Sequence, residues 1–140
     1  ALKTKSFKAL KGQLPWPADG RIIAKFGRQW NSKLKTTTEN PGIDIKGQPG
    51  SPIRTVLGGV VTTITYIRGY GTTIIVDHGG GFYTVYSHVT NIQTVVDGQV
   101  QNGDIIAYMG DSGSINGSKL HFEIWGKGQK LDPEKWLIKK

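Results

Sequence analysis

Short stretches rich in valine, isoleucine, threonine and aromatic residues recur along this 140-residue chain, and glycine turns separate them. This composition is typical of β-strands. The pattern predicts seven strands, at residues 21–26, 52–57, 60–67, 72–77, 82–88, 104–109 and 120–125. The strongest hairpin signal is Gly79-Gly80-Gly81, between two of these strands. Many short strands at close spacing indicate an all-β fold, an antiparallel sandwich or barrel.

Helix is expected only near the two ends of the chain. Residues 1–12, up to Gly12, are typical of the end of a helix that continues from upstream. Residues 133–137 suit one helical turn, with Asp132 as its N-cap and Pro133 at the first helical position. Segment 30–41 has little apolar content, which predicts a long loop.

Alternation is clearest in the last predicted strand. Successive side chains of a strand point to opposite faces, so Leu120, Phe122 and Ile124 are expected to face the core. On the same basis Lys119, His121 and Glu123 share the other face, toward a groove or solvent.

Composition narrows the function classes. The chain has no cysteine, which excludes disulfides and thiolate chemistry. The net charge of +8 lies mostly in the lysine-rich first 11 and last 14 residues. A protein that binds nucleic acid more often has a basic stripe across its folded face. We therefore expect that this protein has no nucleic-acid partner. No apolar run is long enough to span a membrane, and no signal peptide is visible, so an export signal would lie upstream.

Several short motifs follow one another in a fixed order through most of the chain. They are Gly42-Ile43-Asp44-Ile45, Asp77-His78-Gly79, Tyr86-Ser87-His88, a Val96…Val100…Gly103-Asp104…Ile106 pattern, and Leu120-His121-Phe122-Glu123-Ile124. Together they resemble the LytM, or lysostaphin-like, metallopeptidase family. The resemblance implies a two-sheet antiparallel sandwich, the barrel-like LytM (lipoyl-like hybrid) fold, with a short N-terminal helix stub.

Active members of that family hold a zinc ion with three protein ligands and one open position for water, as hydrolytic zinc sites do. By the resemblance, Asp44 and His121 match two ligands, and His88 matches an assisting histidine. Two positions depart from the pattern. Asn40 stands where the first ligand histidine belongs, and Lys119 replaces the first histidine of the H-x-H motif.

These departures remove the chemistry of a metal site. A neutral amide is a poor zinc ligand beside imidazole or carboxylate, and an ammonium repels a cation. We therefore expect no zinc and no catalysis, with Lys119 paired to Asp44 or Glu123 in place of the metal. His78, beside the glycine turn, is expected to be structural.

The likeness extends to the EnvC-type murein hydrolase activators through the Lys11–Pro17 lead-in, Ile124-Trp125 and the Asp132-Pro133…Trp136-Leu137 ending. It implies that residues 1–12 end an upstream coiled coil and that 13–140 form a degenerate LytM domain. It also implies a periplasmic or other extracytoplasmic place in the cell envelope. The family activates N-acetylmuramoyl-L-alanine amidases that cleave peptidoglycan in cell division, and a membrane FtsEX complex recruits its coiled coil. The expected amidase-binding groove comprises Asn40, Asp44, His88, Lys119 and His121.

Three alternatives stay open on the sequence. The chain could be an active zinc endopeptidase that cuts peptidoglycan cross-links, or a peptidoglycan-binding module without activity. A lipoyl- or biotinyl-type carrier ranks last, because the hairpin tip Gly79-Gly80-Gly81 has no lysine to modify.

Overall fold

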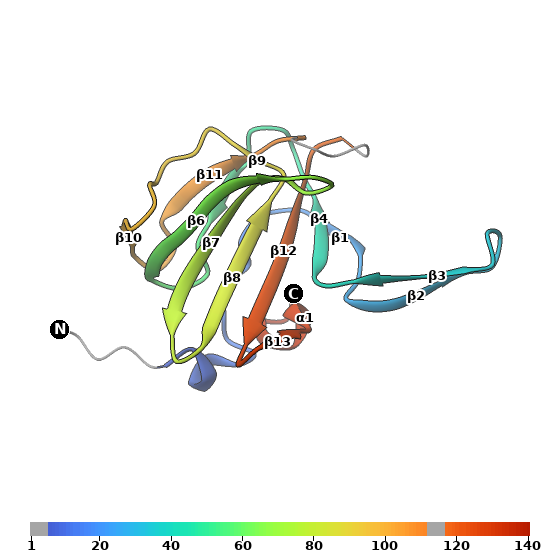
Figure 1. The fold of residues 1–140 in the computed structure, drawn as a ribbon, viewed down its shortest axis with the longest axis horizontal. Coiled ribbons are helices and arrows are strands. Elements are labelled where there is room, and N and C mark those ends of the chain that lie inside the picture. Colours follow the sequence, from blue (N-terminus) through green and yellow to red (C-terminus); the bar gives the residue numbers. More distant parts are fainter. Residues whose placement is uncertain (1–5, 112–116) are drawn as a thin grey trace.

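A computed structural model describes residues 6–111 and 117–140 of the chain (Figure 1). The chain forms thirteen strands, one 3-10 helix and one short α-helix in these residues. Their bounds are η1 Phe7–Leu10, β1 Arg21–Ala24, β2 Gly27–Asn31, β3 Thr36–Asn40, β4 Ile43–Lys46, β5 Pro52–Arg54, β6 Gly59–Ile67, β7 Gly71–Gly79, β8 Phe82–Ser87, β9 Val89–Thr90, β10 Gln99–Val100, β11 Ile105–Met109, β12 Lys119–Gly126, β13 Gln129–Leu131 and α1 Pro133–Trp136.

The strands form two packed antiparallel layers and one projecting ribbon. The large sheet has the order β1-β4-β12-β8-β7-β6-β10, and β13 pairs with β12 beside this path. A small sheet of β5, β11 and β9 forms the second layer, and β2 and β3 form the ribbon. The predicted all-β antiparallel sandwich is confirmed, and each of the seven predicted strands has a counterpart.

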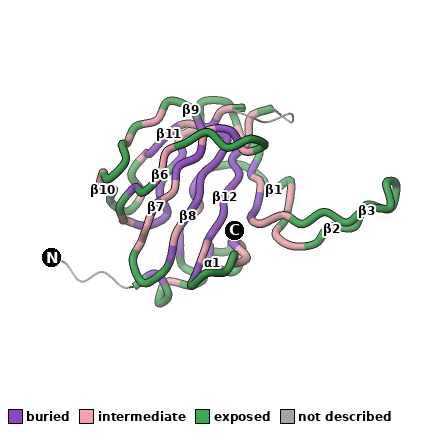
Figure 2. Tube along the Cα trace, viewed as in Figure 1, coloured by how far each residue is buried: buried purple, intermediate pink, exposed green. Residues whose placement is uncertain are grey.

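The core lies between the two layers. Ile43 and Ile45 of β4, and Leu120, Phe122 and Ile124 of β12, are fully buried in it. Figure 2 shows that most of β8 and β12 is buried. Burying each such side chain contributes about 1.5–3 kcal/mol of stability. The predicted core face of β12 is therefore confirmed, and the register of β4 on β12 follows from it: His121 lies opposite Asp44.

The predicted loop at 30–41 was wrong. Gly27–Asn31 and Thr36–Asn40 instead pair as a regular hairpin that projects from the body (Figure 1). Its strands show no apolar alternation because both faces lie in solvent, but β-branched threonines at 36–38 favour a strand. The turn is made by Lys35 in the left-handed region, at φ 52°. Trp30 and Leu34 remain 65% and 70% exposed near its tip.

The first and last described elements, η1 and α1, pack against each other through Phe7 and Trp136. The first five residues, part of the predicted helix, fall outside the described residues, and Phe7–Leu10 form a single 3-10 turn. Phe7 is buried in a cluster of three rings with Phe82 and Trp136, which also contact each other. The predicted helix at the other end is confirmed as α1, and Asp132 caps it by accepting from the backbone N–H of Glu134. In the described part of the chain, no helix is long and apolar enough to cross a membrane.

Candidate functional site

One cavity of about 410 Å³ lies where the ribbon joins the large sheet. The five residues expected to form a groove all line it: Asn40, Asp44, His88, Lys119 and His121. The inner face of the ribbon contributes Gln29 and Thr38, and the β6–β7 turn contributes Gly69 and Tyr70. A second hollow shares Asn40 and Tyr70 with this cavity, so the groove continues along the base of the ribbon.

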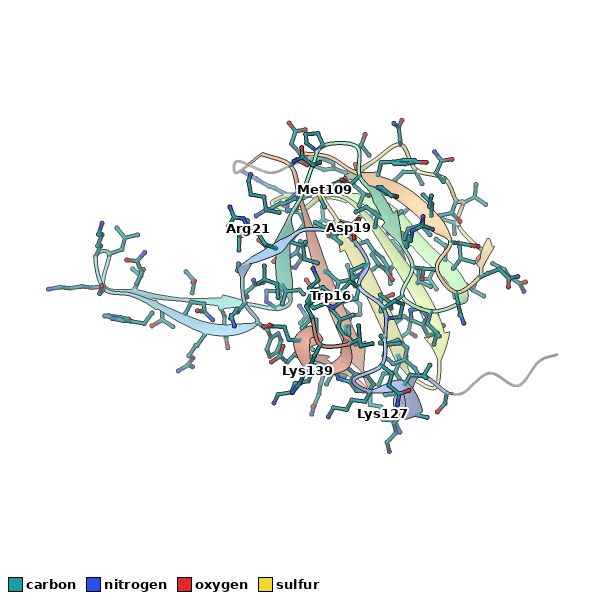
Figure 3. All side chains as sticks on the ribbon, turned by 180° about the vertical axis from the view of Figure 1, so that it is seen from behind. Trp16, Asp19, Arg21, Met109, Lys127 and Lys139 are labelled. Atoms are coloured by element: carbon teal, nitrogen blue, oxygen red, sulfur yellow. The ribbon has the colours of Figure 1, made fainter. Side chains whose placement is uncertain are left out.

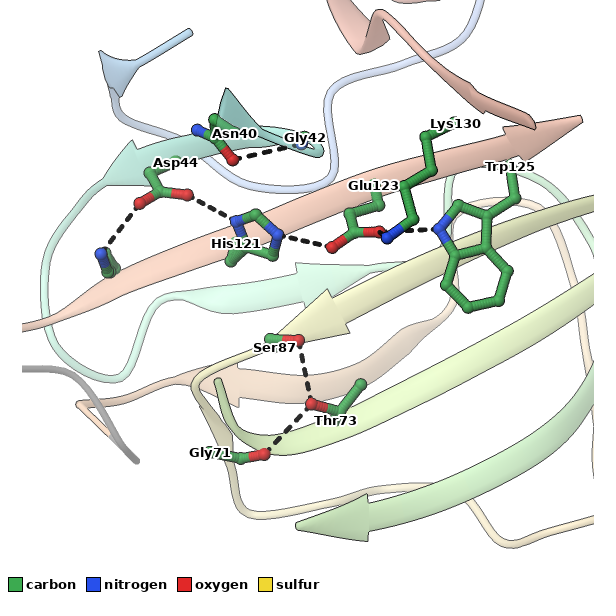
Figure 4. A network of polar contacts seen from close by, with 11 residues as sticks. Asn40, Gly42, Asp44, Gly71, Thr73, Ser87, His121, Glu123, Trp125 and Lys130 are labelled. Atoms are coloured by element: carbon green, nitrogen blue, oxygen red, sulfur yellow. Dashed lines mark hydrogen bonds and ion pairs between the residues drawn. The ribbon is translucent and has the colours of Figure 1, made fainter. Parts of the chain in front are cut away.

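A chain of charged side chains forms the floor of this groove (Figure 4). Lys119 Nζ lies 2.8 Å from Asp44 Oδ2, and Asp44 Oδ1 lies 2.6 Å from His121 Nδ1. The other ring nitrogen of His121 lies 2.7 Å from Glu123 Oε2. Glu123 also accepts from the indole N–H of Trp125 and lies 3.8 Å from Lys130. The predicted pairing of Lys119 with Asp44 is confirmed.

The local charges decide the protonation states in this network. Burial by itself lowers the pKa of His121, but its hydrogen bonds to Asp44 and Glu123 outweigh burial and raise it. Burial raises the pKa of Asp44, yet the bonds from His121 and Lys119 lower it overall. The pKa of Glu123 is lowered in the same way, chiefly by His121. Both ring nitrogens face carboxylates, which favours the imidazolium form of His121, in which both nitrogens donate.

His121 lines the groove, as expected, but it is buried there. His121 and Glu123 share one face of β12 with Lys119, as the alternation predicted, but they are only 3% and 5% exposed. The ring of Tyr70 covers His121, with the ring centroids 4.8 Å apart. Burial, together with the carboxylates of Glu123 and Asp44, raises the pKa of Tyr70, so its phenol stays protonated. Sequence reasoning missed Tyr70; the only signal is an aromatic residue within the turn Gly69-Tyr70-Gly71.

His88 occupies an unusual backbone position at the edge of the groove. It follows β8 with a φ of 64°, in the left-handed region that non-glycine residues rarely adopt. The backbone N–H of His88 donates to the carbonyl oxygen of Tyr70, and the carbonyl oxygen of His88 accepts from the backbone N–H of Gly110. These two bonds hold the backbone of His88 in place. The side chain is buried at 3% exposure, so the strained backbone places an imidazole in the wall of the groove.

His78 lies away from this groove. Its ring nitrogens lie 2.9 Å from the carbonyl oxygen of Gly58 and 2.7 Å from Thr84 Oγ1. Burial lowers the pKa of His78, which favours the neutral ring that links Gly58, just before β6, to Thr84 of β8. These contacts agree with the structural role expected for it.

The donor set does not fit a zinc ion. The amide oxygen of Asn40 is turned to the backbone N–H of Gly42, 3.2 Å away, as in an Asx turn. Both ring nitrogens of His121 are engaged by carboxylates, and its imidazolium form has no lone pair for a metal, while the Lys119 ammonium lies against Asp44. Across residues 6–111 and 117–140, no three His, Asp or Glu side chains are placed to share a cation.

Comparison with known proteins settles the family. The sequence profile of peptidase family M23 matches residues 38–133, which is more than half of the chain. The chain belongs to peptidase family M23. The resemblance to LytM-type domains is thereby confirmed. The match begins within β3 and covers the five expected groove residues, Asn40, Asp44, His88, Lys119 and His121, but not β2.

Two curated relatives of this M23 domain are murein hydrolase activators. EnvC of Escherichia coli strain K12 is 30% identical over 96% of the chain and 31% of its own length. NlpD of Salmonella typhimurium is 36% identical over 87% of the chain and 30% of its own length. The chain therefore spans about a third of these relatives. A zinc-containing peptidase from Vibrio cholerae has the same fold, with a TM-score of 0.81 at 22% identity, over 92% of this chain and 41% of that one.

Proposed function

We propose that this M23 domain is a non-catalytic activator of a peptidoglycan amidase of the N-acetylmuramoyl-L-alanine type. The single observation that carries the proposal is the ion-paired floor of the groove, where Lys119 and His121 hold Asp44 in place of a cation. The names of its activator relatives support the same role. The domain acts in the cell envelope, outside the cytoplasm. An upstream coiled coil, ending within residues 1–12, would connect it to a membrane FtsEX-type complex.

The shape of the groove suggests how the amidase is engaged. The inner face of the β2–β3 ribbon presents Gln29 and Thr38, whose polar groups can hydrogen-bond an extended polypeptide. The charges on the floor are already paired, so the groove does not require an ionic ligand. A segment of the amidase lies in the groove, and binding stabilises the amidase conformation whose own active site is open.

The test is dye release from labelled peptidoglycan sacculi with the domain alone, the amidase alone, and both together. We expect release only with both. Thr38→Arg places a bulky charged side chain in the groove. It is expected to reduce dye release by about tenfold or more, because it blocks the contact between the groove and the amidase segment. Thr37→Arg is the matched control, since Thr37 is the exposed neighbour on the opposite face of the same strand. Release by the domain alone would contradict the proposal and indicate a peptidase.

Zinc binding gives a second, independent test. The double variant Asn40→His with Lys119→His restores two imidazoles and removes the ammonium beside Asp44. We expect it to bind zinc about 100-fold or more tightly than the parent chain, measured by calorimetry at neutral pH. The single variant Asn40→His keeps the ammonium and should gain much less. Stoichiometric zinc on the parent chain, or no gain in the double variant, would mean that these positions do not correspond to ligands.

A further inference from the structure

A larger cavity, of about 890 Å³, lies at the other end of the large sheet. It is bounded by η1, by the start of β6, by β10 and by the β7–β8 turn. The strand β8 runs from Phe82, which lines this cavity, to Ser87, which pairs with His121. At about 3.3 Å per residue, the two ends of β8 are roughly 17 Å apart, so this cavity is separate from the groove.

Two lysines line this cavity, Lys8 of η1 and Lys127 of the β12–β13 turn, and its lining contains no aspartate or glutamate. The carboxylates of Asp77 and Asp104 contact the lining, where they are held by the backbone N–H groups of Gly79 and Gln101. Among the ion pairs of the described residues, neither lysine takes part. Figure 3 shows Lys127 at this end of the molecule, near η1. Two ammonium groups that take part in none of these ion pairs favour an anionic ligand.

The rest of the lining suits a ligand that carries amides as well as carboxylates. Gln99, Gln101 and Asn102 present side-chain amides along one wall. Asn102 accepts from the Gly58 backbone N–H at 2.6 Å through its carbonyl oxygen, and the NH2 end of the same amide is a donor. Phe7 and Phe82, stacked with centroids 5.0 Å apart, give the cavity an apolar base.

We propose that this cavity binds a carboxylate-bearing peptide stem of peptidoglycan. The inference rests on the proposed function, which places the domain at the cell wall. Peptide stems offer free carboxylates to Lys8 and Lys127 and backbone amides to the glutamine and asparagine side chains. The domain is thereby held on its polymer by one end, while the groove at the other end stays open to the amidase. Weak sites of this kind act through the many copies that a polymer presents.

The test is co-sedimentation of the 140-residue chain with purified sacculi. The variant Lys8→Ala with Lys127→Ala removes both ammonium groups from the cavity and is expected to weaken binding by about tenfold, since exposed ion pairs contribute up to about 1 kcal/mol each. Lys33→Ala with Lys35→Ala, on the ribbon, is the matched control. It removes the same charge, and Lys35 has the same φ of 52° as Lys127, so both doubles carry the same backbone change. The control should bind within about twofold of the parent chain.

The two proposals fail in different ways. With a soluble muropeptide substrate the amidase needs no attachment to sacculi, so the Lys8/Lys127 variant should still activate it fully. Thr38→Arg should show the reverse, with normal sedimentation and lost activation. Equal losses of sedimentation in both lysine doubles would mean general charge attraction and would overturn the cavity proposal. Unchanged sedimentation of the Lys8/Lys127 variant would overturn it as well.

Discussion

Replacing Gly42 with alanine is expected to destabilise the domain by about 2 kcal/mol or more. A Cβ at this position would lie 2.8 Å from Glu123 Cγ and closer still to the carbonyl oxygen of Phe122. The obstacle is the backbone of β12, which cannot rotate away as a flexible side chain can. Overpacking of this kind costs about 3 kcal/mol, and the lower chain entropy of unfolded alanine offsets at most about 1 kcal/mol.

The same change should also disturb the groove. Gly42 precedes β4 and its N–H holds the Asn40 side chain, so a shift there moves Asp44 relative to His121. Urea unfolding measures the free energy, and dye release with the amidase measures the groove. Gly27→Ala is a suitable control. A Cβ at Gly27 would meet no atom within 4 Å, so the only strain comes from the φ of 98° at this position. A loss below about 1 kcal/mol for Gly42→Ala would mean that β4 and β12 do not pack so closely.

Gly42 also shows why motifs predicted part of the site well. The string Gly-Ile-Asp-Ile combines a close backbone approach, two core residues and one carboxylate that faces the groove, and each of these roles has a physical reason in the structure. Because the strand period is two, the positions of Asp44 and His121 on facing strands follow once the core residues are known. The meeting of Lys119 with Asp44 could therefore be predicted from residue types and spacing.

Other features lacked such a signal in the sequence. The strands of the ribbon have no alternation of apolar and polar residues, because neither face of the ribbon packs against the core. The sequence pattern therefore predicted a polar loop at these residues. The burial of His121 depends on Tyr70, which comes from a turn some 50 residues away in the chain and carries no motif. The cavity with Lys8 and Lys127 is assembled from separate segments, and nothing local marks these lysines among the others at the chain ends.

The largest single loss of stability is expected from His121→Leu, at about 3 kcal/mol or more. Leucine fills the space of the ring, so the effect is one of charge. The side chains of Asp44 and Glu123 are only 13% and 7% exposed, and each is an anion that His121 contacts. Removing one partner of a buried ion pair leaves an uncompensated charge, which typically costs about 3–5 kcal/mol. Lys119 still pairs with Asp44, so Glu123 carries most of the penalty.

A double-mutant cycle assigns that penalty to Glu123. Glu123→Gln removes the charge but keeps an oxygen for the Trp125 N–H, so in the His121→Leu background it should recover about 1 kcal/mol or more. In the parent chain the same change should instead destabilise, because it removes a partner of the imidazolium. Chemical denaturation of the four proteins at pH 6 and 25 °C gives the coupling energy. Additive effects would show that His121 and Glu123 do not act as one unit, and that the groove floor is held by packing alone.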